Sequence, residues 1–392
     1  MGDFWKEREK KKINKKKITI AIILLILIVV FAVTSIIYIN NKAARGWIDK
    51  NILQKEKTQN NLPSIEIEDS DNSSYYAFNK YIGILNKNNF QIYDNTGKKT
   101  NELTLEITKP IFASNGRYLV VAEEKGRKLY VIADKDIIWE KDVEGNISQV
   151  CVNRNGYVAV NIVDTSYKTV TELYDGQGEF KFKAVSMSRV IASTISDNNK
   201  YLALAEVDTT GTMIQSNIKI ISIDDGINDA ANSVKKIYNG ENNELITNIK
   251  YQEKNKLVCM YTDKIKVIKT DETTENLQEY GDKKVSFASI DLANSSITIE
   301  EKSSGLFTAD SIVNIVNSDN KGVSLYTAES VTKEIYTSNN IIALNLGSEV
   351  EFINTNGWLV KKYIAEQEIT SIIISDTVAG IVYRDKIEII NL

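Results

Sequence analysis

None of the 392 residues is histidine, the side chain on which most acid–base and nucleophilic sites depend. Nucleophiles activated by histidine and metal sites with histidine ligands are therefore excluded. The residues left for chemistry are carboxylates, and two adjacent pairs, Glu123-Glu124 and Glu300-Glu301, have the residue type that glycosidases use. Adjacent strand residues point to opposite faces, so neither pair by itself makes an acid–base couple.

Two further groups of residues have the composition of a site. Asp224–Asp229 gathers oxygen ligands around a glycine, but it lacks the regular spacing and final glutamate of an EF-hand loop, so a plain hairpin turn is the favoured interpretation over calcium. Cys151 and Cys259 lie in apolar strands of different repeats, which favours two buried hydrophobic side chains over a disulfide. The sequence predicts no catalytic residue, no metal site and no cofactor.

The strands that carry these residues recur with a regular period. Eight short apolar segments start between 37 and 56 residues apart, and each is followed by a second strand that ends in Asp, Asn or Gly. A period of this size built from strands is typical of a β-propeller. The apolar segments are Tyr81–Leu85, Tyr118–Ala122, Tyr157–Val163, Tyr201–Val207, Leu257–Tyr261, Ser296–Glu300, Ile341–Leu346 and Val378–Tyr383.

The last repeat lacks its outer strand. The sequence stops after its third strand, Lys386–Asn391, while a spare strand, Ser64–Glu68, precedes the first repeat. Pairing the spare strand with the last repeat would close the ring and leave no open edge there. We therefore predict an all-β, eight-bladed propeller with an N-terminal latch strand. Seven blades is the alternative, if the weak Ser296–Glu300 repeat merges with a neighbour.

Three turn-and-strand segments resemble the repeats of WD40-like and quinoprotein-like propellers: Ser114–Val120, Asn155–Ala159 and Asp197–Ala203. The whole arrangement is similar to an uncharacterised clostridial family of signal-anchored extracytoplasmic propellers, which implies the fold and leaves the function unassigned. Quinoprotein dehydrogenases also have eight blades and place paired cysteines near the quinone. This chain has no adjacent cysteines, and the tryptophan of those repeats occurs only at Trp139 and Trp358.

A second domain precedes the propeller. Ile18 to Ile39 is 22 residues without a charge, and as a helix it would be roughly 33 Å long, enough for a hydrocarbon core of about 30 Å. A cleavable signal usually has a shorter apolar region, and a propeller has no place for such a core helix. We predict a basic tail over 1–17, a transmembrane signal anchor over 18–39, a juxtamembrane stalk over 40–61 and a propeller over 62–392.

Charge sets the expected orientation and restricts the partners. Residues 1–17 contain eight Lys/Arg, and the twenty residues after the apolar span contain five, so the tail is expected in the cytoplasm and the propeller outside a single-pass cell-membrane anchor. Without the tail, 40 basic and 49 acidic residues remain. This negative balance argues against nucleic acid as a partner.

Long loops supply the candidate functional site. The fourth repeat has surplus residues between its second and third strands, at Asp208–Asn217, and the loops Asp164–Lys168 and Lys302–Asp310 of other repeats are also long. In a propeller these loops share a face with the blade-to-blade connections. Function concentrates in such loops on a rigid scaffold. The candidate partner-binding rim is Tyr167, Asp208, Thr209, Met213 and Phe307.

The resulting expectation is a non-enzymatic scaffold or adaptor that binds another envelope protein. Three alternatives stay open. In the first, the propeller is a sensor that binds a small ligand or glycan in its funnel. In the second, it is a hydrolase or lyase whose carboxylates come from different blades, and in the third, the long hairpin has no binding role.

The orientation is testable in intact protoplasts. Added protease should remove the propeller and leave the N-terminal tail protected, because the charge bias retains the tail in the cytoplasm. Immunoblots against a tag at each end read out the result. Protection of the propeller would contradict the orientation.

Overall fold

The computed structural model describes residues 15–41, 44, 48, 52, 62–68, 70–241, 244–269, 273–303, 305 and 309–392. The chain forms two compact units, Met1–Lys57 and Thr58–Leu392. In the first unit, helix α1 (Lys15–Asn40) contains a span, Ile22–Asn40, that is long and apolar enough to cross a membrane. A signal sequence and a membrane anchor both fit such a helix. Residues 1–14 and most of the predicted stalk lie outside the described residues.

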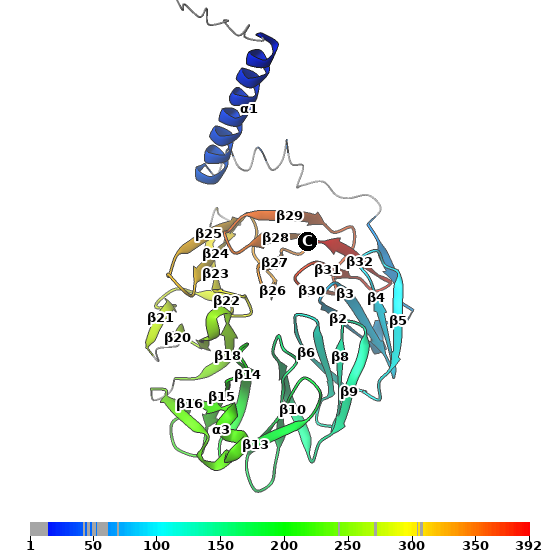
Figure 1. Ribbon diagram of the computed structural model, residues 1–392, viewed down its shortest axis with the longest axis vertical. Helices are drawn as coiled ribbons and strands as arrows, with labels where there is room; N and C mark the ends of the chain where they lie inside the picture. Colours follow the sequence, from blue (N-terminus) through cyan, green and yellow to red (C-terminus); the bar gives the residue numbers. More distant parts are fainter. Residues whose placement is uncertain are drawn as a thin grey trace, which may run out of the picture. The chain divides into compact units, whose positions relative to one another are not determined.

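The described part of the second unit contains eight four-stranded antiparallel sheets, arranged as blades around a central axis (Figure 1). The innermost strands are β2 (Ser73–Phe78), β6 (Pro110–Asn115), β10 (Asn146–Val152), β14 (Arg189–Ile195), β18 (Ile246–Gln252), β22 (Val285–Ser289), β26 (Glu334–Ser338) and β30 (Ser371–Ile374). The second strands are β3 (Tyr81–Asn86), β7 (Tyr118–Glu123), β11 (Val158–Val163), β15 (Tyr201–Asp208), β19 (Lys256–Tyr261), β23 (Ser295–Ser303), β27 (Ile341–Asn345) and β31 (Val378–Val382).

The outer half of each blade is built from a third and a fourth strand. The third strands are β4 (Asn89–Tyr93), β8 (Lys128–Ala133), β12 (Thr169–Tyr174), β16 (Gln215–Ser222), β20 (Lys264–Ile268), β24 (Ala309–Asn317), β28 (Glu349–Asn354) and β32 (Lys386–Asn391). The fourth strands are β5 (Lys99–Thr104), β9 (Asp136–Asp142), β13 (Phe180–Ser186), β17 (Val234–Asn239), β21 (Thr274–Glu279), β25 (Val323–Ala328), β29 (Leu359–Ile364) and, in the last blade, β1 (Ser64–Glu66).

Burial explains the two sequence patterns. The second strands are apolar throughout because both of their faces pack against neighbouring blades, and all of β31 is buried. The outer strand β9 alternates exposed and half-buried residues, as expected for a sheet edge facing water. The described residues form eight apolar clusters, and each cluster joins two neighbouring blades. The core of this propeller therefore lies between its blades.

The predicted latch is confirmed. Strand β1 pairs with β32 in antiparallel register, with Ile65 opposite Ile387. Ile65 is only 3% exposed and joins the cluster between the last and first blades. Figure 1 shows the first blade (blue) beside the last blade (red). The Ser296–Glu300 segment belongs to a complete blade of its own, β22 to β25, so the count is eight and the seven-bladed alternative is excluded.

The fourth repeat differs from the prediction in where its surplus residues lie. Part of the surplus lengthens β15 and β16, whose loop covers only 209–214. The rest forms helix α3 (Ile223–Asn228) and the 3-10 turn η2 (Ala230–Asn232) between β16 and β17. The predicted hairpin turn at Asp224–Asp229 is therefore wrong.

Local capping explains why this segment is helical. Ser222 is the N-cap of α3, and its Oγ accepts a hydrogen bond from the Asp225 backbone N at 3.3 Å. Gly226 is required inside the helix, because a Cβ there would lie 2.8 Å from the Phe182 ring. Two further 3-10 turns, η1 (Ser70–Asn72) and η3 (Glu253–Asn255), complete the described elements of this unit.

A partly buried ion-pair network stabilises the junction between the fifth and sixth blades. Asp319 pairs with Lys254 at 2.7 Å and with Lys256, whose side chain is 6% exposed. Burial alone would raise the pKa of Asp319, but hydrogen bonds from Lys254, Lys256 and Asn294 outweigh it and hold the pKa well below its usual range.

The latch should carry the stability of the whole ring. Deleting residues 62–69, or replacing Ile65 by Asp, should lower the unfolding temperature of the propeller in a single transition, because the last blade loses its edge strand or gains a buried charge. The substitution should cost about 3 kcal/mol or more. Calorimetry of the full chain measures the change. Glu66→Gln, on the same strand but exposed, is the control, and undiminished stability of the deletion would contradict the latch.

The Asp319 network should make stability depend on pH. Its folded-state pKa lies below the unfolded value of about 3.9, so its contribution is present above that pH and is lost as the pH falls through the folded pKa. Asp319→Asn should therefore destabilise the propeller by roughly 2 kcal/mol at neutral pH and by less below about pH 4. Thermal melts of the wild-type chain and the variant at neutral pH and below about pH 4 measure this difference in stability. An equal difference at both pH values would contradict the prediction. As a control, Asp225→Asn removes a half-exposed ion pair and should change the stability little at either pH.

Candidate functional site

Strand order gives the propeller two distinct faces. Turns between first and second strands, and between third and fourth strands, lie on one face, here the turn face. Loops between second and third strands and the blade-to-blade connections lie on the other, here the loop face. This division follows from the strand directions, which alternate within every blade. Each face presents one candidate site.

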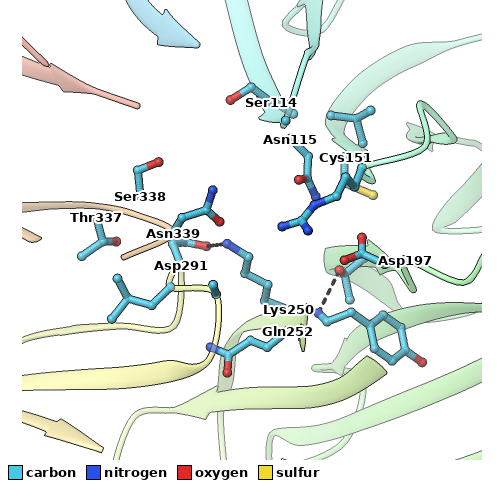
Figure 2. Close-up of a pocket in the computed structure, with 18 of the residues that line it drawn as sticks. Ser114, Asn115, Cys151, Asp197, Lys250, Gln252, Asp291, Thr337, Ser338 and Asn339 are labelled. Atoms are coloured by element: carbon cyan, nitrogen blue, oxygen red, sulfur yellow. Dashed lines mark hydrogen bonds and ion pairs between the residues drawn. The ribbon is translucent and has the colours of Figure 1, made fainter. Parts of the chain in front are cut away.

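On the turn face, a cavity of about 340 Å³ occupies the central channel. All eight blades line it with the last residues of their innermost strands and the turns that follow. Figure 2 shows these side chains converging from different blades. The charged residues that line the cavity are Arg154, Asp197, Lys250, Glu253, Asp291 and Asp376.

Hydrogen bonds between consecutive inner turns hold this lining in place. The Asn155 side chain donates to the Asp197 backbone oxygen at 2.6 Å, which ties the third blade to the fourth. Gln252 donates from the fifth blade to the Ile290 backbone oxygen of the sixth at 3.0 Å. Ser375 Oγ donates to the Asn79 backbone oxygen at 2.6 Å and so joins the last blade to the first. The cavity wall is therefore pre-organised.

The charges inside the cavity are unevenly partnered. Lys250 Nζ lies 3.8 Å from an Asp291 oxygen (Figure 2). Asp376 accepts hydrogen bonds from Ser338 Oγ at 2.7 Å and from the Asn339 side chain. Arg154 has no hydrogen bond or ion pair to any residue that the structure describes.

The cysteine in the cavity is a weak nucleophile. Cys151 is partly exposed there, and burial raises the pKa of its thiol to about 11, although the Ser193 hydroxyl at 3.5 Å acts in the opposite direction. Cys259 is a buried free thiol in another blade, and burial also raises its pKa. The two cysteines are separate, as expected from their positions in different repeats.

The adjacent glutamates make structural contacts. Glu123 accepts hydrogen bonds from the Thr108 and Lys109 backbone nitrogens, at 2.5 and 3.0 Å. Glu300 pairs with Lys283 at 2.9 Å, and Glu301 accepts from Ser286 at 3.0 Å. Neither pair is among the described residues that line the cavity. Among all the residues that the structure describes, Asp224–Asp229 included, no group of three His, Cys, Asp or Glu side chains could hold a metal ion.

On the loop face, the structure places four of the five predicted rim residues. Tyr167, in the β11–β12 loop, is 40% exposed, and Met213, in the β15–β16 loop, is 49% exposed. Asp208 ends β15, and Thr209 follows it in the loop. Phe307 lies outside the described residues. The two loops belong to neighbouring blades and to the same face, as predicted.

The carboxylate of Asp208 orders the loop that follows it. Its Oδ1 accepts from the Thr210 hydroxyl and backbone N at 2.7 and 2.9 Å, and these hydrogen bonds, with the nearby charge of Lys168, lower the pKa of Asp208. Asp164 orders the β11–β12 loop in the same way, accepting from the Tyr167 backbone N at 2.9 Å. These aspartates fix the loops that carry the apolar side chains.

Sequence reasoning missed three exposed apolar residues on this face. Met187 is 71% exposed in the connection from the third to the fourth blade, and Val163 and Ile214 are exposed beside the two loops. The signal was available, because the connections share a face with these loops. We define the apolar rim as Val163, Tyr167, Met187, Met213 and Ile214.

Comparison with solved structures supports the fold. BamB from Moraxella catarrhalis superposes with a TM-score of 0.51 at 10% identity, over 85% of this chain and 99% of that one. Apo AztD from Citrobacter koseri gives a TM-score of 0.47 at 14% identity, over 78% and 93% of the two chains. At such identity the likeness to BamB concerns the fold alone.

Comparisons of sequence place the chain in a family. No curated protein matches it. The model of DUF5711, a family of unknown function, matches residues 53–392, and the chain therefore belongs to the DUF5711 family.

Proposed function

We propose that this chain is a membrane-tethered, extracytoplasmic propeller that acts as a non-enzymatic scaffold or adaptor and binds another envelope protein through the apolar rim. The apolar helix α1 follows a lysine-rich tail, and this pattern supports a signal anchor with the propeller outside, as in the clostridial family that the sequence resembles. The observation that carries the proposal is the concentration of exposed apolar side chains on the loop face of two neighbouring blades.

Contacts between the third and fourth blades bring these side chains together. The Lys168 backbone N, next to Tyr167, donates to the Ser186 backbone oxygen at 3.1 Å, and Ser186 precedes Met187. The Val190 backbone N in turn donates to Thr169 Oγ1 at 3.1 Å. Val207 of β15 pairs with Arg189, so the loop that carries Met213 begins beside the same junction. These contacts bring the segments that carry the apolar rim to one junction between the two blades.

The chemistry of the rim suits a protein partner. Tyrosine supplies a large rigid contact area, and methionine adapts to different apolar surfaces. The ordered loops reduce the entropy lost when the surface is covered. Lys168 and Asp208 lie near each other at the ends of the two loops that carry Tyr167 and Met213, and such charges at an interface edge favour one orientation of a partner. We expect the partner to present an apolar patch with a polar border.

The side chains available for catalysis also favour a binding role. The chain has no histidine, and its adjacent glutamates are engaged by backbone nitrogens, a lysine and a serine. Cys151, the cysteine in the cavity, has a raised pKa.

The proposal predicts loss of the partner when the rim is charged. A photo-crosslinking residue at position 187 of the full chain, in living cells, should capture an envelope protein. In a chain that also carries Met213→Asp, capture should fall by about tenfold or more, because a buried unpaired charge opposes association. Crosslinked adducts are identified by mass spectrometry, and the unfolding temperature should not change, since loop tips contribute little to the core.

Ile227→Asp is the matched control. Ile227 is 51% exposed on helix α3, which follows a third strand and so lies on the turn face. Capture should survive this substitution. Adducts made only with lipid or only with a second copy of the chain would contradict the proposal, as would equal loss in the Ile227 variant.

A further inference from the structure

The cavity on the turn face has the dimensions of a small-molecule site. Its volume of about 340 Å³ lies at the lower end of the range for ligand pockets. The cavity is open to solvent on one side, its volume suits a ligand of the size of an amino acid or a dipeptide, and the polar lining requires that ligand to be hydrophilic.

Arg154 offers an available cation in this cavity. The aliphatic part of its side chain lies over the neighbouring turn, where a Cβ on Gly116 would be 3.6 Å from Arg154 Cγ. Its guanidinium has no partner among the described residues. Arg117, in the equivalent turn of the second blade, instead pairs with Asp134 at 2.5 Å. An unpaired guanidinium presents two parallel N–H donors that match a carboxylate.

Asp197 offers an available anion in the next blade. It lines the cavity (Figure 2), and its carboxylate has no hydrogen bond or ion pair to the residues that the structure describes. Asn155, adjacent to Arg154 in the chain, donates to the Asp197 backbone oxygen, so the two turns are in direct contact. Of the other acidic side chains, Asp291 faces Lys250 and Asp376 accepts from Ser338. Glu253 is exposed, as Arg154 is, but it lies in the turn of the fifth blade, which no hydrogen bond among the described residues joins to the turn of Arg154.

We infer that the cavity binds a small zwitterion, a free amino acid or a dipeptide, with its carboxylate on Arg154 and its ammonium on Asp197. An unpartnered cation and an unpartnered anion on bonded neighbouring turns fit a ligand that carries both charges. The remaining hydrogen-bonding capacity, from Asn115 and Asn248 in the same lining, suits a peptide group. This site lies on the face opposite the apolar rim and does not depend on the proposed adaptor function.

Chemical dissection of the ligand tests both contacts. Isothermal titration of the full chain in detergent would use alanyl-alanine, its N-acetylated form and its C-terminal amide at roughly millimolar concentration. The zwitterion should bind, and each blocked form should bind about tenfold more weakly or worse, because one charge-assisted contact is lost. No binding of alanyl-alanine, or equal binding of all three dipeptide forms, would overturn the inference.

Variants assign the contacts to residues. Arg154→Gln and Asp197→Asn should each weaken alanyl-alanine binding by about tenfold or more, whereas Arg117→Gln, in the equivalent turn, should leave it unchanged. Unchanged binding in the Arg154 variant would overturn the assignment. The Met187 and Met213 substitutions should not affect binding, so failure of the adaptor proposal and failure of this one are distinguishable.

Cys151 provides a readout that needs no variant. It lines the same cavity, whereas Cys259 is buried elsewhere. Saturating alanyl-alanine should slow the reaction of Cys151 with a methanethiosulfonate reagent several-fold, as measured by mass spectrometry, because the ligand covers the thiol. An unchanged rate would place the dipeptide outside the cavity and overturn the inference.

Discussion

The structure depends on burial between blades. Each blade is a thin sheet whose second strand is apolar on both faces, so it cannot bury its own side chains and needs a neighbour on each side. The eight clusters that join neighbouring blades satisfy this requirement only in a closed ring. Ile65 shows how closure is achieved, since a residue from before the first blade completes the edge of the last blade and enters the cluster that joins the two.

Closure also determines what the centre of the ring can do. The innermost strands converge there, and their final residues cannot all be apolar because the channel is lined by turns whose backbone groups need partners. Asn155, Gln252 and Ser375 satisfy such groups in the next blade and fix the turns relative to one another. Arg154 and Asp197 are thereby held on neighbouring turns without being partnered. A rigid wall with unpartnered charges is suited to recognising a small charged molecule.

The two faces separate two kinds of surface. The loop face carries short loops ordered by Asp164 and Asp208, with apolar side chains at their tips. The turn face carries polar turns linked from blade to blade. Because strands of alternating direction connect the faces through the buried clusters, a loop tip and a cavity residue of the same blade belong to one rigid sheet. A ligand in the cavity and a partner on the rim would therefore be held by the same pair of blades, the third and fourth.

The sequence by itself determined the all-β class, the eight blades, the latch and the apolar helix, because these follow from local periodicity and from unbroken apolar runs. It also placed Tyr167 and Met213 on one face, since strand direction alternates along the chain. It did not reveal the cavity, because Arg154 and Asp197 are 43 residues apart and line the same cavity only after their two blades pack side by side. It placed Asp224–Asp229 in a hairpin, because the Ser222 cap and the Phe182 ring that admits only glycine are contacts of the folded chain. Periodicity encodes which face of a strand is buried, whereas side chains from separate repeats come together only when the ring closes.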